Sequence, residues 1–281
     1  MLQLKFGLKR AVTERPAFVM GILNATPDSF YENSRGGVER ALQLINEGAD
    51  IMDIGGESTR PGYTPVSVEE EIARIVPVIQ AVRRESSIPI SVDTTKLEVF
   101  KAAYGAGADI WNDVTALSGA RKADGNDEKS ADGTAAAANE PSIESAKFIA
   151  STGVSVILMH TGPGSVKEVS DFLGQRLVFC LSHGVDSEKV IVDPGIGFGK
   201  STEECIELIK NPLSVTDGSY PLLMALSRKR CIGEMTGRDA ENRLFGTLAA
   251  DLISVQRGAK IIRVHDVSSA IDTLNVMKNL Q

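Results

Sequence analysis

The feature that most constrains the fold of this chain is a regular alternation between short apolar runs and longer amphipathic segments. Eight apolar runs have the length and composition of buried strands, at 18–24, 51–55, 88–93, 109–113, 154–160, 190–193, 222–226 and 260–265. Each is followed by a segment with helical periodicity, at 36–48, 67–84, 96–106, 143–152, 167–183, 202–210, 239–257 and 266–279. Eight strand-then-helix units predict a parallel sheet, and their number favours a closed (β/α)8 TIM barrel. An open doubly wound sheet is the alternative, but no glycine-rich dinucleotide fingerprint follows the first strand.

Two segments lie outside this repeat. Residues 2–17 precede the first strand, and we expect this short N-terminal extension to form a hairpin that plugs the lower end of the barrel. Residues 119–141 are rich in Ala, Asp, Gly, Asn and Ser, so they cannot bury enough apolar surface to offset the entropy of ordering. We interpret them as a flexible insertion after the fourth strand rather than a linker, because the same repeat resumes afterwards. The chain, 1–281, is therefore expected to form a single domain.

The composition limits the classes of protein to which the chain can belong. A net charge of −7 disfavours general nucleic-acid binding. Three scattered cysteines without CxxC spacing argue against a disulfide framework or a zinc knuckle and indicate a reducing compartment. No apolar run reaches the ~18 residues of a membrane span, and Lys5, Lys9 and Arg10 interrupt any signal-peptide core. We expect a cytoplasmic protein with neither a nucleic-acid nor a membrane partner.

The last predicted strand ends in two side chains that suit an anion. Arg263 and His265 are two residues apart, so on a strand they project from the same face. A guanidinium and an imidazole that converge at a strand end predict a site for an anion or a metal diphosphate. Taken alone this signal is weak, because Arg and His end many strands by chance.

Other predicted strands also end in polar residues, and in a (β/α)8 barrel catalytic groups lie at these carboxyl ends. The positions are Asn24, Asp53, Asp93, Asn112, His160, Asp193 and 227–229. A single Asp or Asn there more often caps a turn or a helix. Together, however, carboxylate, amide and ammonium groups match a flat polar heterocycle. The loop GGESTRPG at 55–62 suits phosphate oxygens, although a simple polar turn is an equal alternative.

Seven blocks of the sequence, taken in order, resemble the signatures of the dihydropteroate synthase family of pterin-binding TIM barrels. They are MGILNATPDSF (20–30), GGESTRPG (55–62), SVDT (91–94), NDV (112–114), DPGIGFGK (193–200), SRK (227–229) and RVHDV (263–267). The resemblance covers nearly the whole chain from Phe18 onward, and the fixed order of the blocks makes it specific.

The resemblance implies a transferase of folate biosynthesis, and a target of sulfonamides, that joins 4-aminobenzoate to 6-hydroxymethyl-7,8-dihydropterin diphosphate, giving 7,8-dihydropteroate and diphosphate. It implies Mg²⁺ as cofactor, with Asn24 as the metal position, and commonly a homodimer. By similarity, the pterin ring is held by Asp93, Asn112, Asp193 and Lys229, and the diphosphate by Thr59, Arg60, Arg263 and His265. The 4-aminobenzoate pocket is expected to be shaped by Phe30, Pro61, Ser227 and the stem of Lys229, with Phe198 among the substrate-binding residues. The residues expected to act in catalysis are Arg60, Asp93, Lys229 and Arg263.

The chemistry that we expect from this set is an SN1-like alkyl transfer. As the bond from methylene carbon to diphosphate oxygen breaks, negative charge grows on the leaving group, where Mg²⁺, Arg60 and Arg263 stabilise it. Asp93 and Asp193 stabilise the cationic pterin that the aromatic amine attacks. An arylamine loses its proton readily after attack, so His265 is assigned to diphosphate binding rather than to a general base or a metal ligand.

Two residues are expected to have structural roles, and others depart from the family pattern. Lys200 is expected to tether its loop and His160 to pack at a strand end. Arg230, Ala225 and the loop at 31–37 differ from the family pattern around the 4-aminobenzoate site, which leaves second-substrate affinity and sulfonamide response open.

Two other functions are alternatives for such a sequence. A pterin barrel that transfers a methyl group to a corrinoid protein would share the ring-binding residues but would not need the Ser-Thr-Arg loop or the Arg-x-His end. A non-catalytic homologue would be expected to lack the diphosphate residues, and here they are all present.

Overall fold

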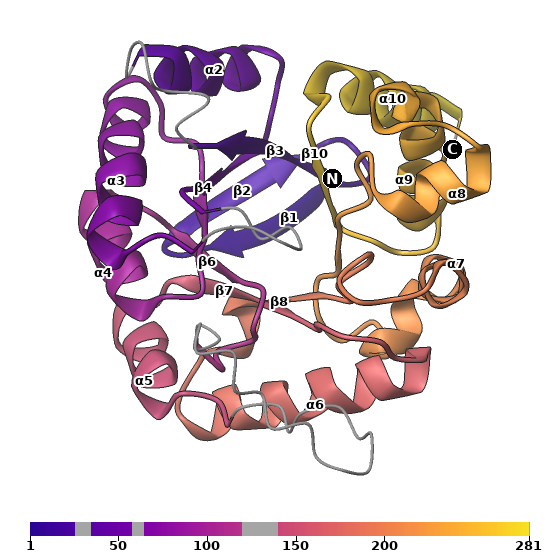
Figure 1. Ribbon diagram of the computed structural model, residues 1–281. Coiled ribbons are helices and arrows are strands. Elements are labelled where there is room, and N and C mark those ends of the chain that lie inside the picture. Colours follow the sequence, from indigo (N-terminus) through magenta and orange to yellow (C-terminus); the bar gives the residue numbers. More distant parts are fainter. Residues whose placement is uncertain (26–34, 58–64, 120–139, 281) are drawn as a thin grey trace.

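The computed structural model describes residues 1–25, 35–57, 65–119 and 140–280, and at its centre eight parallel strands form a barrel (Figure 1). Around the sheet the strand order is β8-β7-β6-β5-β4-β3-β10-β9. A parallel bridge between Val192 and Leu222 joins β8 to β9 and closes the ring. The predicted (β/α)8 barrel is confirmed. The strands are β3 (Phe18–Asn24), β4 (Ile51–Gly55), β5 (Ile90–Asp93), β6 (Ile110–Asp113), β7 (Ser155–Met159), β8 (Val190–Asp193), β9 (Leu223–Met224) and β10 (Ile261–Val264).

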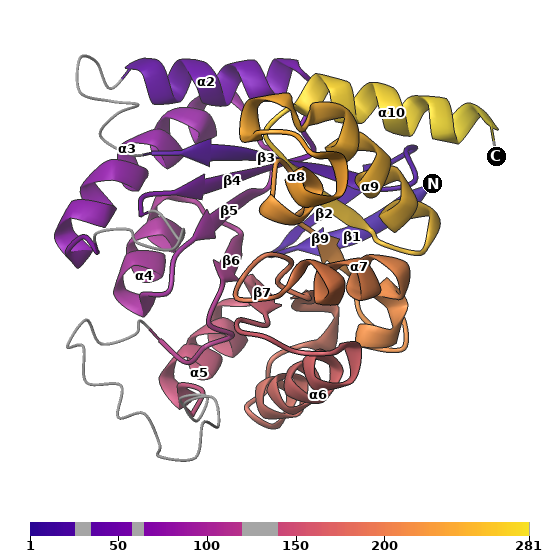
Figure 2. The ribbon, with the colours of Figure 1, turned by 45° about the vertical axis from the view of Figure 1, so that its right-hand side comes forward.

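Helices surround the strands in both views of the molecule (Figures 1 and 2). The helices that follow successive strands are α2 (Arg35–Asn46), α3 (Val68–Glu85), α4 (Leu97–Ala106), α5 (Ile143–Thr152), α6 (Val166–Ser182), α7 (Thr202–Lys210), α9 (Leu244–Gln256) and α10 (Val267–Leu280). Short helical turns are η1 (Ser187–Lys189), η2 (Pro212–Val215) and η3 (Ala240–Asn242). No helix in these described ranges is long and apolar enough to cross a membrane.

The structure corrects one part of the predicted helix pattern. A further helix, α8 (Arg230–Thr236), follows β9, and the helix expected over 239–257 begins only at Leu244. Helix α8 is not predicted from the sequence, because its 7 residues are too few to show helical periodicity.

The N-terminal extension forms the expected hairpin, with β1 (Leu2–Phe6) antiparallel to β2 (Lys9–Thr13). The backbone N–H of Gly7 donates to Ser155 Oγ at 2.9 Å, and Lys9 Nζ lies 2.9 Å from a carboxylate oxygen of Asp109. Asp109 and Ser155 stand at the amino ends of β6 and β7, and Phe6 is fully buried in the lumen core. The hairpin therefore plugs the amino-terminal end of the barrel, as predicted.

Inside the barrel an apolar layer lies beneath a polar one. Isoleucines from five strands belong to the lumen core, and on four of these strands a polar side chain follows two residues further along. The pairs are Ile51 with Asp53, Ile110 with Asn112, Ile191 with Asp193 and Ile261 with Arg263. The period of two residues thus directs the polar groups toward the carboxyl end of the lumen, above a floor that excludes water.

The predicted insertion falls between β6, the fourth barrel strand, and α5. Its residues 120–139 lie outside the described part of the chain, so the expected flexibility stays a prediction.

The hairpin plug predicts a large loss of stability when Phe6 is truncated. The Phe6 ring is fully buried and packs edge-to-face on Phe18, with 5.4 Å between ring centroids. We expect Phe6→Ala to lower the free energy of unfolding by about 3–5 kcal/mol in urea denaturation, because removing it leaves a cavity in the lumen. Leu8→Ala, at a side chain that is 87% exposed, is the control and should change it by less than about 0.5 kcal/mol. Equal effects of the two changes would show that the hairpin does not contribute to the core.

Candidate active site

The centre of the polar layer is the guanidinium of Arg263, which projects from β10 across the lumen. Its Nε donates to Asp53 Oδ2 at 2.6 Å, and its Nη2 donates to Asp93 Oδ2 at 3.0 Å. Asn112 Nδ2 lies 3.3 Å from both carboxylate oxygens of Asp53. Side chains from β4, β5, β6 and β10 therefore meet in one hydrogen-bonded cluster, although they are distant in sequence.

Asp53 is the residue of this cluster to which the sequence analysis gave no role. Its side chain is fully buried, and it accepts hydrogen bonds from both Arg263 and Asn112. The signal that identifies it is strand parity, because Asp53 lies two residues after the lumen-facing Ile51. Without Asp53, the buried guanidinium would lose one of its two anionic partners.

The Asp93 carboxyl has a pKa close to neutral pH. Burial raises its pKa to about 7, while the charge of Arg263 opposes that rise. Burial likewise opposes the charge of Arg263, but Asp53 and Asp93 outweigh it and raise the pKa of that guanidinium. The second oxygen of Asp93, Oδ1, is buried without a hydrogen-bond partner among the described residues. It is therefore an acceptor available to an N–H group of a ligand.

Asp193 and Lys229 form another side of the same layer. Asp193 Oδ1 accepts from the backbone N–H of Gly195 at 2.7 Å. Lys229 Nζ donates to the carbonyl of Ile196 and lies 4.7 Å from the ring centroid of Phe198. Burial lowers the pKa of Lys229 to about 8 and raises that of Asp193, and each partner's charge opposes the shift of the other. This side of the layer thus presents one acidic and one basic side chain that are both shielded from water.

Lys200 fixes the loops behind this side. Its buried ammonium contacts His160 Nδ1 at 2.9 Å, the His160 carbonyl at 3.3 Å and the Gly162 carbonyl at 3.1 Å. Burial, with the charge of Lys200, lowers the pKa of His160 to about 4, so its ring is neutral near pH 7. The contacts agree with the tethering role expected for Lys200 and with the packing role expected for His160.

The rim near β9 and β10 is held by two contacts between their following loops. His265 Nδ1 lies 3.0 Å from Ser227 Oγ, which also accepts from the His265 backbone N–H at 3.2 Å. Arg228 adopts a left-handed backbone conformation (φ 57°), and its Nε and Nη2 each lie 2.9 Å from an oxygen of Asp266. A left-handed non-glycine residue stores strain that surrounding contacts must offset. Arg228 thereby sets the turn that carries Ser227 and Lys229.

The structure brings together most of the residues that the sequence analysis assigned to the site. Those at the carboxyl ends of strands or in the loops after them are Asn24, Asp93, Asn112, Asp193, Phe198, Ser227, Lys229, Arg263 and His265. Four others lie outside the described residues: Phe30, Thr59, Arg60 and Pro61. The described part of the site thus holds the residues assigned to the ring and one half of those assigned to the diphosphate.

The described residues of the site offer few oxygen ligands for a metal ion. They therefore suit a hard cation only if a bound ligand supplies most of the coordinating oxygens. Among the residues that the structure describes, no three His, Cys, Asp or Glu side chains gather as a metal site. Asn24, exposed at the end of β3, offers one amide oxygen beside β10. Mg²⁺ keeps several waters and is commonly bound through one or two protein oxygens plus substrate phosphates. The residues therefore fit Mg²⁺ that arrives with an anionic substrate.

Comparison with known proteins gives one consistent result. The family model described as "Pterin binding enzyme" matches residues 20–265. Dihydropteroate synthase of Escherichia coli strain K12 is 37% identical over 278 residues, which covers 92% of this chain and 90% of that protein. The structure of Xanthomonas albilineans dihydropteroate synthase with 4-aminobenzoic acid superposes with a TM-score of 0.85 at 39% identity, covering 99% and 98% of the two chains. The structure of the Xanthomonas albilineans enzyme in complex with 7,8-dihydropteroate superposes with a TM-score of 0.81 at 36% identity and covers the same shares of the two chains.

The raised pKa of Asp93 predicts how the stability of the ligand-free protein depends on pH. The pKa of this carboxyl is about 7 in the folded protein, whereas its ordinary value is 3.8. The folded state therefore holds the proton more tightly, so this group's contribution to stability is lost as pH rises from about 4 to about 7 and is constant above. Asp93→Asn removes the proton exchange, and its free energy of unfolding relative to wild type should rise across that window.

Urea denaturation at a series of pH values measures this difference. Asp171→Asn, at an exposed position on α6, is the control and should show no such trend. A wild-type-to-variant difference that stays constant with pH would contradict the assignment of the raised pKa to Asp93.

Proposed function

This chain belongs to the pterin-binding enzymes and, among them, to the dihydropteroate synthases, and from this premise we propose how its site performs the reaction. The first substrate is 6-hydroxymethyl-7,8-dihydropterin diphosphate, the second is 4-aminobenzoate, and the products are 7,8-dihydropteroate and diphosphate. The observation that carries the proposal is the polar layer above an apolar floor. In it the Arg263 guanidinium bonds Asp53 and Asp93, and Asn112 bonds Asp53. Asp193 and Lys229 form another side of this layer. Relatives solved with 4-aminobenzoic acid and with 7,8-dihydropteroate support the choice of substrates.

The pterin ring is held by the buried polar groups. Carboxylates accept from ring N–H groups, and the Asn112 amide and the Lys229 ammonium donate to ring nitrogens and the carbonyl. The unpartnered Oδ1 of Asp93 is the clearest position for a ring donor, because a buried acceptor without a partner is costly. Selectivity follows, since a ligand without matching donors leaves these groups unpaired.

The reaction breaks the bond between the ring's methylene carbon and a diphosphate oxygen. Arg263, His265, Thr59 and Arg60 bind the diphosphate and stabilise the charge that grows on it. Asn24 would hold Mg²⁺ together with the substrate, and the ion would supply additional neutralisation of the leaving group. Ionised Asp93 and Asp193 stabilise the positive charge on the pterin, so no covalent bond to the enzyme is required. The 4-aminobenzoate nitrogen then attacks the methylene carbon and releases its proton.

The 4-aminobenzoate pocket is assigned to the rim of the barrel, with Ser227, Phe198 and the Lys229 stem on the described side. Arg230, which departs from the family pattern, is turned to the surface, where Nη1 lies 2.8 Å from Glu234 and Nη2 donates to the Lys200 carbonyl at 3.1 Å. Its guanidinium is therefore engaged by these two partners. Sulfonamides, which resemble 4-aminobenzoate in shape and charge, are proposed as competitive inhibitors.

We also propose a homodimer in the cytoplasm. All three cysteines are free thiols, as a reducing compartment would leave them. Exposed apolar side chains lie on α9 and α10, including Phe245 (83% exposed) and Val276 (59% exposed), and a dimer interface would cover them. Phe245→Glu should shift the mass of the protein in solution from two chains to one, as measured by light scattering. A wild-type mass of one chain would contradict the dimer.

A product assay tests the proposed activity directly. Purified protein, pterin diphosphate, 4-aminobenzoate and Mg²⁺ should give 7,8-dihydropteroate and one diphosphate per turnover. Chelation of Mg²⁺ should lower the rate by at least about 100-fold, because the leaving group loses part of its charge stabilisation.

Asp93→Asn is the informative variant in the same assay. It keeps the shape of the side chain and removes its charge, so we expect kcat/KM to fall by at least about 100-fold. Near wild-type activity in a folded Asp93→Asn protein would overturn the role of Asp93, and no product from wild type would overturn the function.

A further inference from the structure

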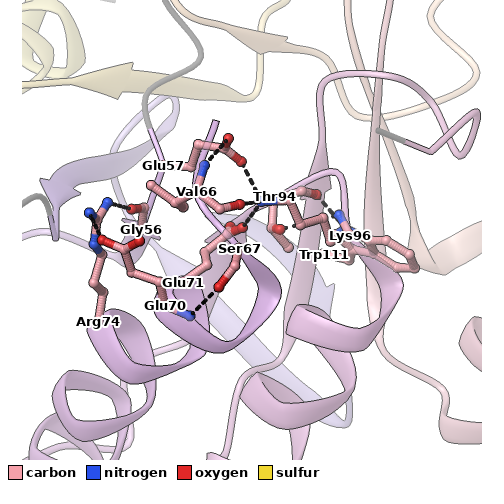
Figure 3. A network of polar contacts seen from close by, with 10 residues as sticks. All are labelled: Gly56, Glu57, Val66, Ser67, Glu70, Glu71, Arg74, Thr94, Lys96 and Trp111. Atoms are coloured by element: carbon pink, nitrogen blue, oxygen red, sulfur yellow. Dashed lines mark hydrogen bonds and ion pairs between the residues drawn. The ribbon is translucent and has the colours of Figure 1, made fainter. Parts of the chain in front are cut away.

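A second buried cluster of charges lies outside the polar layer of the lumen. Lys96, the residue before α4, directs its ammonium into the space between α3 and the loop that follows β4 (Figure 3). Its Nζ donates to Glu57 Oε2, Glu71 Oε2 and the Val66 carbonyl, each at 2.8 Å. An ammonium has three N–H donors, and here all three are used.

Two of these partners are the start and the end of one loop. Glu57 follows β4, and Val66 lies two residues before the start of α3 at Val68. The other oxygen of Glu57, Oε1, accepts from the Val66 backbone N–H at 3.1 Å. Glu57 and Val66 are thus bonded to each other and to the same ammonium, so their positions relative to each other are fixed.

The base of the loop is also packed closely against α3. A Cβ on Gly56 would lie 2.8 Å from Ile75 Cγ2 and 2.9 Å from Glu71 Cγ, so a side chain at this position would force them apart. Arg74 Nη1 donates to the Gly56 carbonyl at 2.7 Å (Figure 3). Glycine at position 56 therefore lets the loop start directly on the helix that carries Glu71.

Stability alone is a poor explanation for this cluster. Glu71 is fully buried, and its Oε1 has no hydrogen-bond partner among the described residues. Burial by itself lowers the pKa of Lys96, but the bonds to Glu57 and Glu71 raise it above its ordinary value, so the ammonium stays charged. Buried ion pairs are often no more stabilising than apolar side chains of similar volume. The geometry that the cluster imposes is thus the better reason for its presence.

The cluster is connected to the ring-binding layer through β5. Lys96 comes three residues after Asp93, and Thr94 between them accepts from Trp111 Nε1 at 2.7 Å through its carbonyl. Thr94 Oγ1 in turn accepts from the Lys96 backbone N–H at 3.2 Å. The position of Lys96 is therefore fixed relative to Asp93 and to the residue beside Asn112.

We propose that Lys96 is a positioning residue which, with Glu71, fixes Glu57 and Val66 relative to Asp93. This inference rests on the proposed function, in which Thr59 and Arg60, which lie between Glu57 and Val66 in the sequence, bind the diphosphate while Asp93 binds the ring. A single substrate is then held at its ring and at its diphosphate by two sites in a fixed relation. Displacement of one site by about 1 Å can lower a rate by about 100-fold.

Two ligands that differ only in the diphosphate provide the test. Binding of 6-hydroxymethyl-7,8-dihydropterin and of its diphosphate, with Mg²⁺, is measured by calorimetry for wild type and Lys96→Met. We expect affinity for the diphosphate and kcat/KM to fall by about 10- to 100-fold. Affinity for the ring without diphosphate should stay within about twofold. Lys101→Met, which removes a lysine paired with Glu144 at the surface of the same helix, is the matched control.

A double variant separates positioning from folding. Lys96→Met leaves two carboxylates without their cation, whereas Lys96→Met with Glu71→Met replaces the most buried pair with apolar groups. We expect the double variant to recover thermal stability without recovering affinity for the diphosphate.

The outcomes distinguish the inference from the function on which it rests. Recovery of both stability and affinity in the double variant, or equal loss of affinity for both ligands, would show a structural role and overturn the inference alone. Unchanged binding in Lys96→Met would also overturn it. Failure of wild type and Lys101→Met to bind the diphosphate would overturn the proposed function and this inference with it.

Discussion

The constraint on which the rest of the structure depends is the parallel pairing of β10 with β3, which joins the end of the chain to its beginning. This pairing, with the bridge from β8 to β9, closes the sheet, so all eight carboxyl ends lie around one opening. Arg263 faces Asp53 and Asp93 across the lumen only because its strand is held in this register. An open sheet of the same strands would place them on separate edges, with the guanidinium in water.

The site and its surroundings depend on cations that are each partly buried among more than one acceptor. Arg263 lies between two carboxylates, Lys229 between Asp193 and a carbonyl, and Lys96 between two glutamates and a carbonyl. Removing such charges from water is costly, and only complete sets of partners offset the cost. The apolar floor beneath Arg263 and Lys229 keeps water out and strengthens their interactions. The same burial that makes these groups costly holds Asp93 and Lys229 at shifted pKa values that suit a change of charge in a ligand.

Periodicity predicted the barrel because each strand and helix buries a face that is visible in the local pattern. Periodicity does not predict short elements correctly. Strand β9 has only two residues although the apolar run is longer, and helix α8 is not predicted at all. For the site, the polar residues at strand ends predicted Asp93, Asn112 and Asp193. Asp53 is also predictable, because side chains two residues apart on a strand share a face and Asp53 follows Ile51 by two residues. The cluster around Lys96 was also missed, because Lys and Glu near helix starts are usually exposed to water.

The sequence by itself determined the closed barrel, the hairpin beneath it and the family, because these follow from local patterns and from blocks in a fixed order. The tertiary structure alone decided which charges share partners and which lose their water. Arg263 and Asp53 are 210 positions apart, and nothing in their neighbours specifies that they meet. The energy of a charge depends on its distance to other charges and on its burial. Both quantities are set only when the whole chain has closed around the lumen.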